Sequence, residues 1–301
     1  MRNSFGASII AFAAGIVWSL GAILARKADG ADAFQYLVWR SIGIIVVLEL
    51  VAIIRRRPPM MLRAFTSGRV MLYANLGLLL ASFGFVYAVK TTSAANAAFL
   101  SSLTPLMTSI IAFLVLGERL TKVTVITLIV AMCGLLVMVV GDLSAGNQLG
   151  NLAALASSVG FAIYAVSVRS NPHLDWSPVM PGYALLMIIL CATITLANGR
   201  TLLPSASDVV LPLIHGGLLI VVGTTLFNWS TRHLAVGSAA VFAQSEMVFI
   251  PLWGVLFLGE RPPATTYLGG AIILGAVAAK TVLDSRLTRA AEANDAPVHA
   301  L

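Results

Sequence analysis

Charged residues are scarce in this chain. Only 10% of its residues are Asp, Glu, Lys or Arg, whereas 59% are hydrophobic. A soluble domain normally has about a quarter charged residues, because its surface must be hydrated. The scarcity excludes an ordinary water-soluble protein. It predicts an all-α polytopic membrane protein, with lipid as the solvent over most of its area.

Cysteines and catalytic motifs are also scarce or absent. Cys133 and Cys191 each fall inside an apolar run, without the spacing of a metal or redox site, which predicts two small buried hydrophobic side chains. The sequence contains no G-x-x-x-x-G-K-[ST] loop, no H-E-x-x-H, no C-x-x-C and no G-x-S-x-G. We therefore expect neither ATP hydrolysis nor any other enzymatic activity, and no metal or cofactor.

A net charge of +7 is compatible with nucleic-acid binding. The basic residues, however, form short clusters between apolar runs, as the orientation signals of membrane proteins do. If the N-terminus is cytoplasmic, the loops on that side hold most of the Lys and Arg residues, among them Arg55–Arg57 and Arg69. The pattern predicts no nucleic-acid partner, a bacterial inner-membrane location, and cytoplasmic N- and C-termini.

Runs of about 20 mostly apolar residues, the length that spans a bilayer, recur along the chain. The first, from Ser8 to Ala25, is longer than the apolar region of a signal peptide, about 7–15 residues, so we expect an uncleaved helix. In all, ten transmembrane helices are predicted, at about 8–25, 34–54, 70–90, 94–116, 123–141, 149–169, 178–197, 209–230, 235–258 and 264–283.

A short sequence occurs twice: LVLGER at 114–119 and LFLGER at 256–261, offset by 142 residues. The same offset aligns Phe85 with Phe227 and Tyr87 with Trp229. Each half contains five spans, an odd number, so two tandem copies must cross the membrane in opposite senses. We therefore expect an inverted 5+5 repeat, typical of secondary transporters. Its parts are residues 1–143, residues 144–284 and a disordered cytoplasmic tail at 285–301. In each copy the glycine of the LGER turn should end a helix.

Ten spans in two halves, with an LGE-type turn after the fourth and ninth, resemble the EamA-type branch of the drug/metabolite transporter superfamily, from about residue 8 to 283. As a whole, rather than by any one motif, the chain is most similar to the YddG-type exporters of aromatic and other neutral amino acids. The resemblance implies a central cavity between the halves and export by alternating access.

Glu246 and Arg40 are the charged candidates for the site, because each lies well inside a predicted span, where charge is costly and typical of function. Glu246 lies near the middle of the ninth span and could bind a substrate ammonium group or a coupling proton, or could be a neutral acid bonded to a neighbouring helix. Arg40, in the second span, could extend to the outer lipid headgroups. Alternatively it could turn inward, to receive a carboxylate or to pair with Glu246.

Neutral polar and aromatic residues complete the predicted substrate site. The alternatives are hydrogen bonds between helices for the polar groups and interfacial anchoring for some of the aromatic ones. Pro105 and Pro251 should bend their helices and act as hinges. The remaining predicted site residues are Trp18, Ser19, Tyr73, Asn75, Ser101, Tyr164, His215, Asn228 and Gln244.

Together these patterns predict a monomeric inner-membrane exporter of small amphiphilic solutes. Aromatic and other neutral amino acids are the first candidate substrates. A multidrug or other metabolite exporter is the alternative. Proton coupling through Glu246 or His215 and facilitated diffusion both remain open. A channel is disfavoured, since no ring of like charges and no repeated filter loop is visible.

Overall fold

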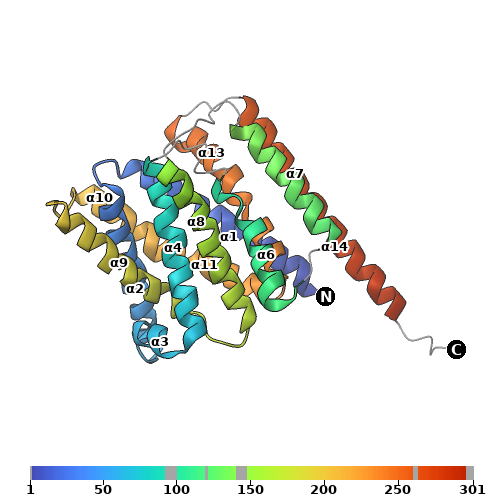
Figure 1. The fold of residues 1–301 in the computed structure, drawn as a ribbon, viewed down its shortest axis with the longest axis horizontal. Coiled ribbons are helices and arrows are strands. Elements are labelled where there is room, and N and C mark those ends of the chain that lie inside the picture. The colour runs from blue at the N-terminus through green and yellow to red at the C-terminus, as the bar shows by residue number, and fades with distance from the viewer. Residues whose placement is uncertain (1, 92–99, 119–120, 140–147, 260–263, 296–301) are drawn as a thin grey trace.

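The structure, a computed structural model, describes residues 2–91, 100–118, 121–139, 148–259 and 264–295. Within these ranges all regular secondary structure is helical (Figure 1). The helices are α1 (Arg2–Lys27), α2 (Ala33–Ile54), α3 (Met60–Thr66), α4 (Arg69–Thr91), α6 (Thr104–Leu116), α7 (Lys122–Val139), α8 (Gln148–Ser170), α9 (Val179–Ala197), α10 (Ala206–Ile214), the π-helical turn η1 (His215–Ile220), α11 (Val221–Thr231), α12 (Val236–Ala243), α13 (Ser245–Leu258) and α14 (Ala264–Asp295).

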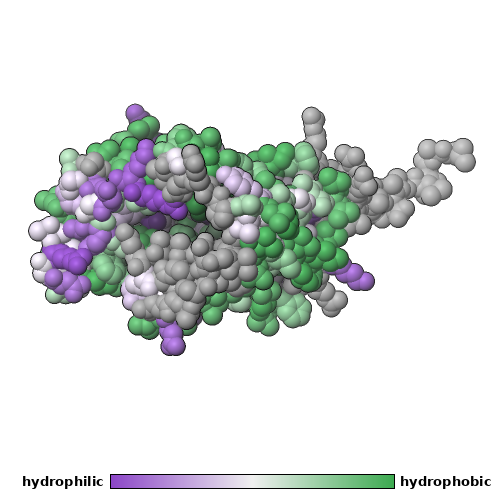
Figure 2. All heavy atoms as spheres, turned by 90° about the horizontal axis from the view of Figure 1, so that it is seen from above, coloured by the Kyte–Doolittle hydropathy of each residue, from purple (hydrophilic) through white to green (hydrophobic). Residues whose placement is uncertain are grey.

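The predicted membrane fold is confirmed. Among the described residues, seven helical segments are long and apolar enough to cross a bilayer. Two of them are built from consecutive helices: α10, η1 and α11 form one span, and α12 and α13 form another. Shorter apolar helices at Thr104–Leu116, Lys122–Val137 and Tyr267–Lys280 occupy the three remaining predicted positions. Seen from above, hydrophobic residues cover the surface toward α7 and α14, whereas hydrophilic residues gather toward α9 and α10 (Figure 2).

Both LGER turns end their helices as the sequence predicts. Gly117 caps α6 with φ of 69°, and Gly259 caps α13 with φ of 66°. This left-handed conformation is readily available to glycine, which has no Cβ. The two helices end on opposite sides of the bundle, α6 toward the lower side of Figure 1 and α13 toward the upper side, as an inverted repeat requires.

The packing of the helices follows the repeat. A shift of 142 residues places α1 on α8, α2 on α9, α6 on α13 and α7 on α14. Accordingly α2 packs against α9 and α7 against α14, each helix beside its own equivalent (Figure 1). The first helix of each repeat packs on the other repeat: α8 lies against α4 and α6, and α1 against α11, α12 and α13. Each half therefore completes the core of the other.

Glycines bring α4 and α8 into backbone contact. A Cβ on Gly77 would lie 2.7 Å from Gly160 O, and one on Gly84 would lie 2.6 Å from Ala153 O. Contact this close is typical of membrane helices, which associate through small residues. The glycine face of α4 is thus a helix-packing face.

Two expectations differ from the structure. Cys191 is buried, but Cys133 is exposed on α7, because an apolar side chain in a spanning helix can face lipid as readily as the core. The helix α14 continues past residue 284 to Asp295, into the segment expected to be disordered.

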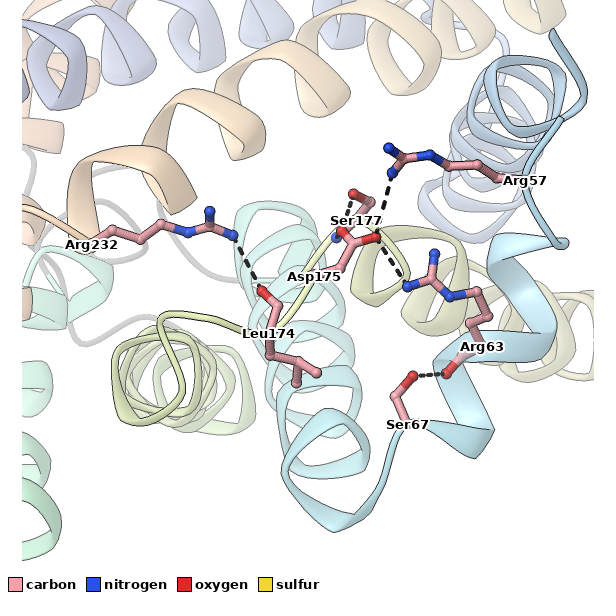
Figure 3. A network of polar contacts seen from close by, with 7 residues as sticks. All are labelled: Arg57, Arg63, Ser67, Leu174, Asp175, Ser177 and Arg232. Carbon is pink, nitrogen blue, oxygen red and sulfur yellow. Dashed lines mark hydrogen bonds and ion pairs between the residues drawn. The ribbon is translucent and has the colours of Figure 1, made fainter. Parts of the chain in front are cut away.

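Ion pairs join helix ends on the side where α3 lies. Asp175, between α8 and α9, accepts from Arg63 Nη2 at 3.0 Å and lies 4.0 Å from Arg57 Nη1 (Figure 3). Partial burial alone would raise the pKa of Asp175. Hydrogen bonds from Ser177, together with the Arg63 guanidinium, instead hold that pKa below its usual value. Nearby, Arg169 Nε donates to Glu118 of the first LGER turn at 2.6 Å, which links the two repeats.

Gly160→Ala should lower the melting temperature of the purified protein. Its Cβ would lie 2.6 Å from Ala81 N and 2.7 Å from Gly77 O, so backbone atoms must move. Such overpacking costs about 1–3 kcal/mol, against a gain of roughly 1 kcal/mol when alanine replaces glycine in a helix. Gly275→Ala is the control, since nothing lies within 4 Å of its Cβ. Equal melting of the two variants would contradict the close α4–α8 contact.

Asp175→Asn should destabilise the protein at neutral pH, and the difference should shrink in acid. Because the pKa of Asp175 is lowered in the folded state, its carboxylate stabilises the fold above the ordinary carboxyl pKa. This stabilisation is lost as the pH falls through the lowered pKa. Melting temperatures measured from about pH 7 to about pH 3 should converge at the acid end. Asp29→Asn, at an exposed acid, is the control; a gap that stays constant with pH would refute the assignment.

Candidate functional site

Two spans, one in each repeat, are interrupted at equivalent positions. The fourth span has a turn at Ser102 and Leu103, before α6, and the ninth has a turn at Gln244, between α12 and α13. Ser102 and Gln244 are separated by the repeat offset of 142 residues, and Gln244 Nε2 donates to Ser102 O at 2.8 Å. The two interruptions therefore meet where the repeats meet.

Each interruption precedes the proline from which a bend was expected. Pro105 lies in the first turn of α6, and Pro251 lies inside α13, well after Gln244. Since proline has no N–H, the carbonyl one turn earlier has no helical partner. Ser101 O accordingly accepts from Ser158 Oγ of α8 at 3.0 Å. The helices are therefore broken at Ser102 and Gln244. Next to the break at Ser102, the Ser158 side chain of the second repeat binds the backbone of the first repeat.

The helix α1 lies directly on the second interruption. A Cβ on Gly15 would collide with Ser245 Oγ, and Ser245 Oγ donates to Phe12 O at 2.7 Å. One turn further along α1, Ser19 Oγ accepts from Trp253 Nε1 at 2.8 Å. α1 of the first repeat is therefore bonded to α13 of the second.

Glu246 occupies the first turn of α13, next to this contact. Among the described residues its carboxylate has no hydrogen-bond or ion-pair partner. Arg40 is not its partner, which removes one of the alternatives left open by the sequence. A charged side chain inside the membrane costs about 2.5–3.5 kcal/mol or more, unless it is protonated or reaches water. A helix N-terminus reduces part of that cost, because its free N–H groups favour negative charge.

Aromatic rings from α1, α8 and α11 form a cluster at the junction of the repeats. Trp18 lies 5.9 Å from Phe161 and 5.5 Å from Phe227, between ring centroids. Tyr164 lies 5.5 Å from Phe161, and its buried hydroxyl donates to Asn228 Oδ1. We call these five residues the aromatic–amide cluster. It combines apolar ring faces with one amide and one hydroxyl group, and Tyr164 and Phe227 are fully buried within it.

A second set of polar side chains, which we call the α2 polar group, consists of Tyr36 and Arg40 of α2 and their partners His215 and Ser82. Arg40, only 6% exposed, donates from Nη2 to Ser82 Oγ of α4. Arg40 therefore points across the bundle and does not extend to the headgroups. Tyr36 of the same helix bonds His215 Nδ1 at 2.7 Å, and His215 packs on Gly21 of α1.

Of the remaining predicted residues, Tyr73 and Asn75 lie away from the junction, and Ser101 lies at it. Tyr73 is 54% exposed, on the outer surface of α4. Asn75 is fully buried, but its Nδ2 donates to Ala64 O at 3.0 Å, so it attaches α3 to α4. Ser101 is buried at the first interruption, and its Oγ has no partner among the described residues. The structure thus brings Trp18, Tyr164 and Asn228 together, and separates Tyr73 and Asn75 from them.

Phe161, Phe227 and Trp253 were not predicted. Phe227 had a signal, since the repeat offset aligns it with a phenylalanine of the first half. Trp253 also had a signal, because Phe249, Trp253 and Phe257 recur every four residues along the chain. In the structure the ring centroid of Trp253 lies 5.6 Å from that of Phe249 and 5.8 Å from that of Phe257. For Phe161 no signal distinguished it from the other apolar residues of α8.

The cavity next to the two helix interruptions is small. A cavity of about 10 Å³, lined by Ser102, Met132 and Gln244 among others, has room for about one water molecule. A larger pocket of about 370 Å³ lies at the helix ends near Asp32 and Arg200. Among the described residues, no group of three or more His, Cys, Asp or Glu side chains could hold a metal ion. Within the described residues, the aromatic–amide cluster and the two interruptions lie where the repeats meet.

The chain matches a transporter family and is similar to proteins named as transporters. Residues 6–140 and 148–280 each match the EamA-like transporter family. The "Uncharacterized transporter YetK" of Bacillus subtilis is 22% identical over 212 residues, which cover 67% of this chain and 64% of YetK. This chain therefore matches slightly less than two thirds of the length of YetK. The "Pseudopaline exporter CntI" of Pseudomonas aeruginosa is 27% identical over 283 residues, covering 88% of this chain and 92% of CntI.

Solved structures share this fold, and one crystal structure illustrates the likeness. It aligns with a TM-score of 0.78 at 21% identity, over 92% of this chain and 98% of the other. At that identity the likeness concerns the fold alone.

Proposed function

The chain belongs to the EamA-like transporter family, and we propose that it exports small amphiphilic metabolites, with aromatic and other neutral amino acids as first candidates. The proposal combines a membrane fold, a duplicated family domain and relatives named as transporters. Transport would proceed by alternating access, with the two repeats moving about the solute between them.

The aromatic–amide cluster is the observation that carries the substrate class. Its rings come from α1, α8 and α11, so both repeats contribute. An aromatic side chain fits against such faces in edge-on or offset contact. The amide of Asn228 and the hydroxyl of Tyr164 supply hydrogen bonds for the polar end of the same solute. In this proposal Trp18, Tyr164 and Asn228 bind substrate directly.

The interruptions would supply the second half of the site and the moving parts. Gln244, Glu246 and Ser101 lie at the two interruptions, and Ser19 reaches α13 through Trp253. Separation of Gln244 from Ser102 would open the junction. Pro105, in the first turn after the break at Ser102, would keep that span from closing into a continuous helix, and Pro251 would act as a bend within α13. Glu246, with no partner among the described residues, would take the coupling proton.

A second candidate substrate is another small metabolite. CntI is named as an exporter of pseudopaline, and the same fold could carry a similar solute here. For location, we propose a bacterial inner membrane with both termini in the cytoplasm. Of the interhelix ion pairs, Arg63–Asp175 and Arg169–Glu118 would then lie on the cytoplasmic face. We propose a monomer, because one chain supplies both repeats.

Uptake of radiolabelled phenylalanine into liposomes containing the purified protein tests the proposal. We expect saturable uptake that other neutral amino acids compete for and that a pH gradient stimulates. Glu246→Gln should lose the response to the gradient, because an amide neither binds nor releases a proton, and should keep uptake without a gradient within about twofold, which is roughly 0.4 kcal/mol. Glu246→Asp, which keeps an acid, should retain the response.

The outcomes separate the two parts of the proposal. Absence of saturable phenylalanine uptake by the unaltered protein would contradict amino-acid export. A gradient response that survives in Glu246→Gln would instead remove Glu246 from proton coupling and leave the substrate class intact.

A further inference from the structure

We propose that Arg40 is the binding point for a carboxylate group of the transported solute, so that the protein selects anionic and zwitterionic carboxylates over uncharged analogues. This inference rests on the proposed function, since it assigns a substrate class to the same transporter.

Arg40 is a buried cation. Its side chain is on α2 and is 6% exposed, and its guanidinium is directed toward α4, where Nη2 donates to Ser82 Oγ. Its Nε is buried and has no acceptor among the described residues. Behind it, the Arg40 backbone is closely packed against Gly216, so the side chain has only the interior between α2, α4 and α9 to occupy.

No acid in the described chain neutralises Arg40. The acids nearest α2 are engaged at its ends, and Asp208 of α10, which packs against α2, accepts from Ser205 Oγ at 2.5 Å. Asp32 caps the first turn and pairs with Arg200 at 2.9 Å. Glu49 accepts from the backbone N–H of Met61 at 2.6 Å, at the end near α3. The guanidinium therefore lies in the membrane interior without a counter-ion from the described residues.

The groups around Arg40 are neutral hydrogen-bonding side chains. Tyr36 and His215 bond each other at 2.7 Å, and the buried Ser41 Oγ has no partner. An uncompensated buried charge is strongly destabilising, so retaining one points to an anion that arrives from outside the chain. A guanidinium binds a carboxylate through two parallel N–H bonds. In Arg40 the Nε–H has no acceptor among the described residues, and Nη2 would exchange Ser82 Oγ for the carboxylate.

The position of Arg40 also fits the rest of the site. His215, bonded to Tyr36 of α2, packs on Gly21 of α1, one helical turn from Trp18 of the aromatic–amide cluster. A solute with an aromatic end and a carboxylate could therefore contact the cluster and the α2 polar group in one orientation.

Ligand-induced thermal stabilisation of the detergent-purified protein tests this site without relying on transport. The probes are phenylacetate and phenylacetamide, which differ in the carboxylate. Phenylacetate should raise the melting temperature of the unaltered protein, and phenylacetamide should not. In Arg40→Gln the apparent affinity for phenylacetate should fall at least tenfold, about 1.4 kcal/mol, and Arg40→Lys should lie between the two.

Two further measurements separate binding from structure. Without ligand, Arg40→Gln should melt at or above the unaltered protein, because it removes an unpaired buried charge, whereas a merely structural Arg40 would make it melt lower. Arg200→Gln is the control for an exposed arginine near the larger pocket, and should leave phenylacetate binding unchanged.

The proposal is overturned if both probes stabilise equally, if neither does, or if Arg40→Gln binds phenylacetate as the unaltered protein does. If Arg40→Gln does not fold, Arg40→Lys and the comparison of the two probes decide. Failed phenylalanine transport with intact, Arg40-dependent phenylacetate binding would contradict amino-acid export alone and leave the carboxylate site standing.

Discussion

Backbone contact between helices of opposite repeats holds the two halves of this protein together. The α4–α8 contact depends on Gly77, Gly84 and Gly160, and the α1–α13 contact depends on Gly15. In lipid there is little hydrophobic force between helices, so close approach and hydrogen bonds must supply the association. Because the first helix of each repeat packs on the other repeat, any solute site at the junction is built from both halves, and relative motion of the halves must change it.

Polar groups inside the bundle divide into two kinds. Some serve structure: Asn75 attaches α3 to α4, and Ser158 satisfies the carbonyl left free before Pro105. Others lack partners among the described residues, above all Glu246 and the Nε of Arg40. Membrane interiors tolerate unpartnered polar groups poorly. Function is therefore assigned to the unpartnered groups and not to those that serve structure.

Much of the fold was predictable, because it rests on signals that run along the chain. Span length, the repeated LGER turn and the odd number of spans per half are local or periodic, and Gly117 and Gly259 end their helices as expected. The site was less predictable. The spacing of Tyr73, Gly77 and Gly84 predicted one shared face. In the structure the two glycines pack on α8, but the Tyr73 side chain is exposed. Sequence spacing did not reveal this difference, because apolar residues line both the core and the lipid side of a span. The pairing of Gln244 with Ser102, and of Trp253 with Ser19, depends on tertiary packing that no local pattern encodes.

The central claim is that one site between the repeats is reached alternately from the two sides of the membrane. A cysteine at position 224, one helical turn before Asn228 on α11, in a protein whose Cys133 and Cys191 are replaced by serine, tests it most directly. Membrane-impermeant thiol reagents are applied to one face at a time in oriented vesicles, with and without phenylalanine. The account predicts labelling from both faces and protection by phenylalanine on both. Labelling from one face only, or labelling that phenylalanine does not alter, would contradict it.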